Sequence, residues 1–122
     1  MSLQRLQKSF GHAVNGLAYL FRTQPNAHIH VAVAAGVLVL SALWRVTLVE
    51  LALVLLAIGL VLVAEAMNSA VEAAVDVATR EIHPRAREAK DVAAAGVLVA
   101  AATSVAIGAL VFGPRLLALL RG

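Results

Sequence analysis

Two long stretches of the chain carry almost no charge, and they limit what the chain can fold into. Residues 46–64 contain Glu50 as their single charged side chain, and residues 92–113 contain none. A helix crosses the hydrocarbon core of a bilayer with about 17–25 mostly apolar residues, so both stretches are long enough. A third stretch, residues 29–44, is slightly short, and we expect its helix to begin near Asn26, directly after a proline. The sequence therefore predicts three membrane-spanning helices.

The composition supports a membrane protein. Of the 122 residues, 61% are hydrophobic and 14% are charged, whereas an ordinary soluble domain has about 45–50% apolar and about 25% charged residues. A soluble fold of this size could not bury so much apolar surface, and disordered chains are poor in apolar residues. The absence of cysteine excludes disulfides, thiolate metal sites and cysteine nucleophiles. We expect one all-α integral membrane domain over residues 1–122.

The N-terminal segment, residues 2–23, has a different pattern. Its apolar residues recur at steps of three and four, which is typical of one face of an amphipathic helix. These residues are Leu3, Leu6, Phe10, Ala13, Leu17 and Leu20. Because the basic residues lie off this face, we expect a helix that lies in the membrane interface. The three spans are then expected over residues 26–44, 46–79 and 87–118, with the second extending into the cytosol.

Basic residues are distributed unequally between the two sides of the predicted spans. Seven of the ten Lys and Arg residues fall on the side that holds the N-terminal segment and the loop near residues 79–91, and three fall on the other side. By the positive-inside rule, the richer side faces the cytoplasm. The net charge of +3 is explained by these flanking residues, so we expect no nucleic-acid partner.

The second span continues past its apolar part as a helix with a polar stripe, without Gly or Pro until Pro84. At about 100° per residue, Glu65, Asn68, Glu72 and Asp76 fall within an arc of about 80°. Carboxylates stacked on one helix face repel each other, which favours a bound cation or ligand. Glu65 is expected at the inner boundary of the hydrocarbon core, and Glu72 about 10 Å further into the aqueous phase. Such a layout suits an enzyme that modifies a lipid with a water-soluble reagent.

The third span is preceded on the same side by Lys90 and Asp91. A lysine can hold a phosphate group as a point charge, and carboxylates together with phosphates are the usual ligands of Mg²⁺. The chain has no glycine-rich phosphate-binding loop of the Walker or protein-kinase type. A nucleotide site would therefore have to be built from helix side chains.

The motif EAMNSAVEAAVD (65–76), followed by AKDVAAAGV (89–97), resembles the signature of the small bacterial diacylglycerol kinase and undecaprenol kinase family. The segment KSFGHAVNGLAYLFR (8–22) is similar to the N-terminal surface helix of that family, so the resemblance covers almost the whole chain. The KSF pattern, the IH that follows Asn26 and the segment HPRAREAKDVAAA (83–95) are closer to the undecaprenol kinase branch of Gram-positive bacteria.

The resemblance implies a kinase of the bacterial inner membrane that transfers the γ-phosphoryl group of MgATP to a lipid hydroxyl. The acceptor would be undecaprenol or diacylglycerol, and the product undecaprenyl phosphate or phosphatidic acid. Family members are homotrimers whose sites lie between subunits. The resemblance also implies that Glu65 is the catalytic base and Glu72 a metal ligand. In the family a Glu stands at the position of Gln24 and shares the metal; Gln offers a carbonyl oxygen without charge, which would weaken or reshape a Mg²⁺ site.

Further residues are assigned to the two substrates by the same resemblance. The residues matched to ATP binding are Arg5, His12, Asn68, Glu72, Asp76, Glu81, His83, Lys90 and Asp91. Those matched to the lipid substrate are Ser9, Phe10, His28 and Glu65.

Some polar residues of the spans allow more than one interpretation. His28 and His30 could line a lipid or proton path, but interfacial polar residues are the commoner case. Glu50 is expected to be solvated or to snorkel near the outer boundary, and Thr103 and Ser104 to bond to their own helix. A small oligomeric transporter and a non-catalytic scaffold subunit are the alternatives to a kinase. The transporter would place an acid near the bilayer midplane, where this chain has none, and the scaffold would need no carboxylate stripe.

Overall fold

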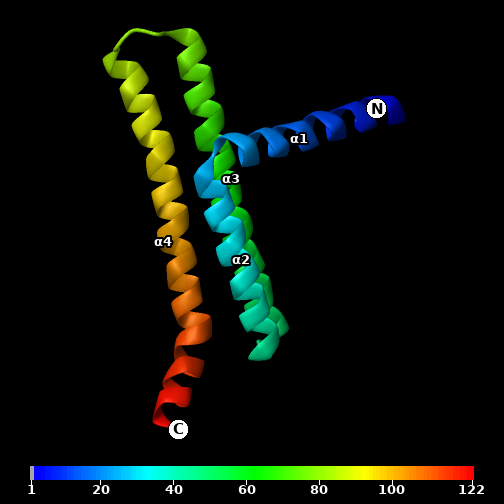
Figure 1. Ribbon diagram of the computed structural model, residues 1–122, viewed down its shortest axis with the longest axis vertical. Helices are drawn as coiled ribbons and strands as arrows, with labels where there is room; N and C mark the ends of the chain where they lie inside the picture. Colours follow the sequence, from blue (N-terminus) through cyan, green and yellow to red (C-terminus); the bar gives the residue numbers. More distant parts are fainter. Residues whose placement is uncertain (1) are drawn as a thin grey trace.

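The computed structural model describes residues 2–122, which form four helices joined by short connections and contain no strand (Figure 1). The helices are α1 (Leu3–Thr23), α2 (Pro25–Leu43), α3 (Leu48–Ala78) and α4 (Pro84–Arg121). Within this range, α2, α3 and α4 are long and apolar enough to cross a membrane. The expectation of an all-α protein with three candidate spans is thereby confirmed.

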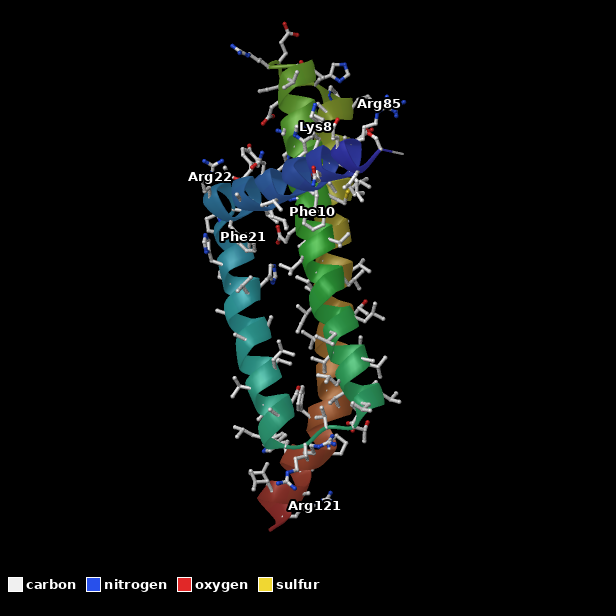
Figure 2. All side chains as sticks on the ribbon, turned by 90° about the vertical axis from the view of Figure 1, so that its right-hand side faces the viewer. Lys8, Phe10, Phe21, Arg22, Arg85 and Arg121 are labelled. Carbon is white, nitrogen blue, oxygen red and sulfur yellow. The ribbon has the colours of Figure 1, made fainter. Side chains whose placement is uncertain are left out.

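Helix α1 extends sideways from the bundle of the other three helices (Figure 1). Ser2 caps its first turn by accepting a hydrogen bond from the backbone of Arg5. In Figure 2, Phe10 and Phe21 point toward the side on which α2 continues, whereas Lys8 and Arg22 point the opposite way. This separation of aromatic and basic side chains is the arrangement expected of a helix at a membrane surface.

Helices α3 and α4 pack along each other, and α2 packs against α3 (Figure 1). Few apolar side chains are buried within the described chain. They are Leu20, Ala27, Val54, Ala57, Val61, Ala100 and Val111. Most large apolar residues of the three spans remain exposed, including Leu56, Val63 and Val105. Because isolated apolar surface of this extent is unfavourable in water, lipid or further protein must cover these faces.

Both ends of α4 lie beyond the expected span of residues 87–118. The helix begins at Pro84, and proline suits the first helical position. His83 caps this end, because its Nδ1 accepts a hydrogen bond from the backbone N–H of Arg85 at 3.1 Å. At the other end the helix continues through Pro114 to Arg121. An internal proline removes one backbone hydrogen bond, but the helix does not end there.

The outer connection between α2 and α3 carries a set of bonds that corrects one expectation. Glu50 and Thr47 form a reciprocal capping box at the start of α3, a common device for satisfying free N–H groups. The same carboxylate accepts two hydrogen bonds from Arg115 of α4, at 2.6 Å and 2.9 Å. Glu50 is therefore not a solvated charge but the centre of a contact between α3 and α4.

Ser104 also differs from its expectation. Its hydroxyl donates to the carbonyl oxygen of Ala57 at 3.2 Å, and so links α4 to α3. The neighbouring Thr103 donates to Val99 within its own helix. The two hydroxyls point to different sides of α4, and only the one on the α3 side finds an interhelical partner.

Candidate active site

Glu65 is the most deeply buried charged side chain among the described residues, with 2% of its surface exposed. It lies on the face of α3 that turns toward α2. There its Oε1 is 3.1 Å from Nε2 of His30. Burying a carboxylate is unfavourable unless a partner is present, so the imidazole provides the compensation. The pair joins the second and third helices where the polar stripe of α3 begins.

Two cavities share His30 of this pair. A cavity of about 320 Å³ is lined by Glu65, His30, Asn26 and residues of α4 that include Val97 and Ala101. A larger groove of about 440 Å³ shares His30 and Ala101 with it, and continues between α2, α3 and α4 as far as Phe112. We call this second space the apolar groove, because its lining residues are apolar except for His30 and Ser104. At one end the groove reaches His30, the partner of Glu65.

The next turns of α3 hold polar groups without partners. Asn68 and Ser69 each have a buried side-chain oxygen with no hydrogen-bond partner within the described chain. Glu72, one turn beyond Asn68, is half-buried. Buried polar atoms are rarely left unpaired in a complete site, so these oxygens indicate that a ligand, an ion or water belongs here. An amide oxygen beside a carboxylate is the kind of donor set that Mg²⁺ takes.

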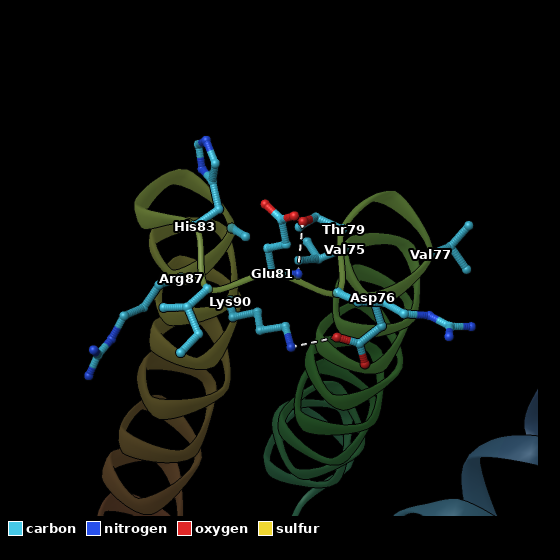
Figure 3. Close-up of a pocket in the computed structure, with 11 residues that line it drawn as sticks. Val75, Asp76, Val77, Thr79, Glu81, His83, Arg87 and Lys90 are labelled. Atoms are coloured by element: carbon cyan, nitrogen blue, oxygen red, sulfur yellow. Dashed lines mark hydrogen bonds and ion pairs between the residues drawn. The ribbon is translucent and has the colours of Figure 1, made fainter.

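A polar cavity of about 770 Å³ lies between the last turn of α3 and the first turns of α4. Figure 3 shows Lys90 and Asp76 reaching toward each other across it, with their Nζ and Oδ1 atoms 2.6 Å apart. Further lining residues are Thr79, Glu81, His83 and Arg87. The volume is in the range of small-molecule sites.

Lys90 precedes the uncharged stretch of residues 92–113, and so lies outside the membrane-spanning part of α4. The hydrogen bond that it donates to Asp76 raises the pKa of Lys90 above its ordinary value, and the charge of Glu72 acts in the same direction. The ammonium group therefore stays charged at neutral pH. It lies half-exposed at the cavity, where it could bind an anionic group.

Other predicted site residues do not meet this cluster within the single chain. Arg5, Ser9, Phe10 and His12 are exposed on α1, which extends away from α4 (Figures 1 and 2). Asp91 is exposed on α4. Their assigned roles stay predictions.

The two remaining predicted residues lie near the joint of α1 and α2. Gln24 is the N-cap residue of α2, and its side chain makes no capping hydrogen bond. The imidazole of His28 reaches back to the carbonyl oxygen of Phe21. Among residues 2–122, no group of three or more His, Asp or Glu side chains is gathered closely enough to hold a metal ion. A role for Gln24 beside Glu72 also stays a prediction.

Sequence reasoning treated His30 as one of two interfacial histidines and did not connect it with Glu65. The structure selects it, because His30 and not His28 faces α3. The available signal was its position on the predicted first span. Which residue of the second span it would face depends on how the two helices pack.

Known proteins are similar to this chain over most of its length. The model of the family described as prokaryotic diacylglycerol kinase matches residues 11–112. The chain belongs to that family. It is 40% identical over 114 residues to an undecaprenol kinase of Bacillus subtilis (strain 168), an alignment that covers 93% of both chains.

A second relative, a diacylglycerol kinase of Synechocystis sp. (strain ATCC 27184 / PCC 6803 / Kazusa), is 35% identical over 113 residues, which cover 92% of this chain and 65% of that protein. These findings confirm the expected enzyme class, a membrane lipid kinase that uses ATP.

Proposed function

We propose that this enzyme phosphorylates the hydroxyl group of undecaprenol in the cytoplasmic leaflet, with diacylglycerol as the alternative acceptor. One observation carries the proposal. The buried carboxylate of Glu65 lines the smaller cavity at the start of the polar stripe, and its partner His30 lines both that cavity and the apolar groove. A long hydrocarbon acceptor fits the groove, and the 40% identity to an undecaprenol kinase favours the isoprenoid alcohol.

In the proposed reaction, Glu65 is the general base. It takes the proton of the lipid hydroxyl while that oxygen attacks the γ-phosphorus of ATP. A new oxygen–phosphorus bond forms, and the bond between the γ-phosphorus and the bridging oxygen breaks, so that ADP leaves with the electron pair. A positioned base contributes about 10²–10⁴ in rate, and the rest of phosphoryl-transfer catalysis is positioning and charge neutralisation.

The nucleotide would bind in the polar cavity between α3 and α4. Lys90 would bind a phosphate oxygen, and Asp76 would hold Lys90 in position. We assign the remaining predicted contacts to ATP as well, namely Arg5, His12, Asn68, Glu72, Glu81, His83 and Asp91. Ser9, Phe10 and His28 would contact the lipid near the interface.

The oxygens available on α3 fit a Mg²⁺ ion. Asn68 has an unpaired buried oxygen, and Glu72 presents a half-buried carboxylate one turn away. When bound, Mg²⁺ would neutralise charge on the ATP phosphates. We assign Glu72 to hold it, and Gln24 to contribute at most a neutral oxygen.

We further propose a homotrimer in the bacterial inner membrane, with the N-terminus and the active site on the cytoplasmic side. The three spans of one subunit leave most apolar residues exposed and Asn68 and Glu72 of the polar stripe half-exposed, and copies of the chain can cover both. In such an assembly, residues of α1 could complete the site of a neighbouring subunit. The seven basic residues on the side of α1 and of the α3–α4 loop support the orientation.

The test uses the purified protein and its Glu65→Gln variant, with ATP, Mg²⁺ and either undecaprenol or diacylglycerol. We expect the variant to lose about 10²–10⁴ in kcat. Activity retained within a few-fold would exclude Glu65 as the base. Phosphorylated undecaprenol formed without phosphatidic acid supports the proposed acceptor, and the reverse result supports diacylglycerol. A wild-type protein that phosphorylates neither lipid contradicts both.

A further inference from the structure

We infer that His30 is a positioning residue, which holds the Glu65 carboxylate so that one of its oxygens faces the lipid hydroxyl. The inference rests on the proposed function, because it takes Glu65 to be the base. It goes beyond that proposal by assigning to a second helix, α2, the orientation of the reactive group.

The first observation is that Glu65 has few partners. Its side chain is 3% exposed, and within residues 2–122 its one hydrogen-bond contact is the 3.1 Å contact between Oε1 and His30 Nε2. The other oxygen, Oε2, accepts no hydrogen bond from the described chain. Since Glu65 lines the cavity of about 320 Å³, the oxygen left free is the one available to a substrate.

The role of Glu65 as a base decides which group donates in the hydrogen bond between His30 and Glu65. An ionised carboxylate can only accept hydrogen bonds, and Glu65 must be ionised to act as a base. Nε2 of His30 must therefore carry the hydrogen in the reactive state, and the histidine acts as donor to Oε1. The direction of this hydrogen bond follows from the chemistry of the base.

The third observation is the place of His30 between the two cavities. Its side chain is 26% exposed and lines both the apolar groove and the cavity at Glu65. A lipid that lies in the groove with its hydroxyl at Glu65 must pass this imidazole. Without the imidazole, the carboxylate would be buried without a partner, which disfavours its charged form, and it would be free to rotate away from the hydroxyl.

The experiment compares three α2 variants in detergent with ATP, Mg²⁺ and the better acceptor lipid. His30→Phe keeps a planar aromatic ring but removes the donor, and His30→Gln restores an N–H donor. Ser41→Ala is the matched control, because Ser41 is a buried polar residue of the same helix whose hydroxyl bonds to Val37 within that helix. Thermal unfolding and gel filtration establish that each variant folds, and His30→Leu replaces His30→Phe if the latter does not.

We expect His30→Phe to lower kcat by about 10- to 100-fold, the range of a lost hydrogen bond to a charged group, while the KM for ATP stays within about two-fold. His30→Gln should regain most of the activity, and Ser41→Ala should match the wild type. His30→Phe activity within about two-fold of wild type, or a Gln variant as slow as the Phe variant, would overturn the inference.

A double variant separates the two proposals. If His30 acts through Glu65, the Glu65→Gln/His30→Phe double variant should be no slower than Glu65→Gln alone. An active Glu65→Gln protein contradicts the proposed base. An inactive Glu65→Gln protein combined with an active His30→Phe protein contradicts only the role of His30.

Discussion

Two glutamates of α3, fifteen residues apart, are held in opposite ways. Glu50 at the outer end accepts hydrogen bonds from both terminal nitrogens of Arg115 and from the backbone of Thr47. Glu65 has His30 as its one hydrogen-bond partner within residues 2–122, and it lines a cavity. A carboxylate that accepts three hydrogen bonds can stabilise the contact between helices. Its oxygens are then poorly available to accept a proton from a substrate. A carboxylate with one partner keeps an oxygen for chemistry.

The strongest test of this contrast is to remove the charge from each glutamate in turn. Glu65→Gln should lower kcat by about 10²–10⁴, whereas Glu50→Gln should change kcat by less than about three-fold, because it lies about 22 Å away along α3 at 1.5 Å per residue. Lipid phosphorylation measured on both variants decides the matter. A Glu50→Gln protein as inactive as Glu65→Gln would show that the two carboxylates are not functionally distinct.

Nucleotide binding gives the next largest effect. Lys90→Met removes the cation that faces the polar cavity and should raise the KM for ATP by about 10- to 100-fold. That is the loss of affinity expected when one hydrogen bond to a charged group is removed. Asp76→Asn keeps the lysine and should give a smaller increase. The KM for the lipid should be unaffected by either change. An increase in the lipid KM alone would place the phosphate site elsewhere.

The two variants should rank in the opposite order when thermal stability is measured in place of activity. Glu50→Gln should lower the midpoint of thermal unfolding, because it weakens both the capping box and the two-pronged bond to Arg115. Glu65→Gln should not lower it, since replacing a buried carboxylate by a neutral group relieves a desolvation cost. Thermal unfolding in one detergent compares the two variants directly.

A second measurement tests whether Glu50 and Arg115 act as a pair. If the two side chains are coupled, the Glu50→Gln/Arg115→Gln double variant should unfold at no lower temperature than the less stable of the two single variants. Additive losses in the double variant would show that the two side chains stabilise the fold independently.

The features that follow one helix could be predicted from the sequence. Apolar runs predicted the spans, and the 3.6-residue period of the α-helix placed Glu65, Asn68 and Glu72 on one stripe of α3. The pairing of Lys90 with Asp76 is also of a kind that a sequence can indicate, because a short loop joins their two helices into an antiparallel pair. In each case the signal lies in local periodicity or in a short connection.

Contacts between distant helices could not be predicted in the same way. His30 and Glu65 are 35 residues apart, and Glu50 and Arg115 are 65 apart. Which side chains meet depends on the rotation and shift of one helix against another. Periodicity gives the face of a helix but not its register with a neighbour.

Ser104 offers the smallest test, on a contact that lies between the two glutamates. Ser104→Ala removes the hydrogen bond to the Ala57 carbonyl and should cost about 0.6 kcal/mol, the average for interhelical hydrogen bonds in a membrane protein. Thr103→Val is the matched control, because its hydroxyl bonds within α4. Thermal unfolding should show a small loss for Ser104→Ala alone, with kcat unchanged. Equal losses in both variants would mean that Ser104 does not hold α4 to α3, and that the outer pair of Glu50 and Arg115 is the main polar bond between these helices within the spans.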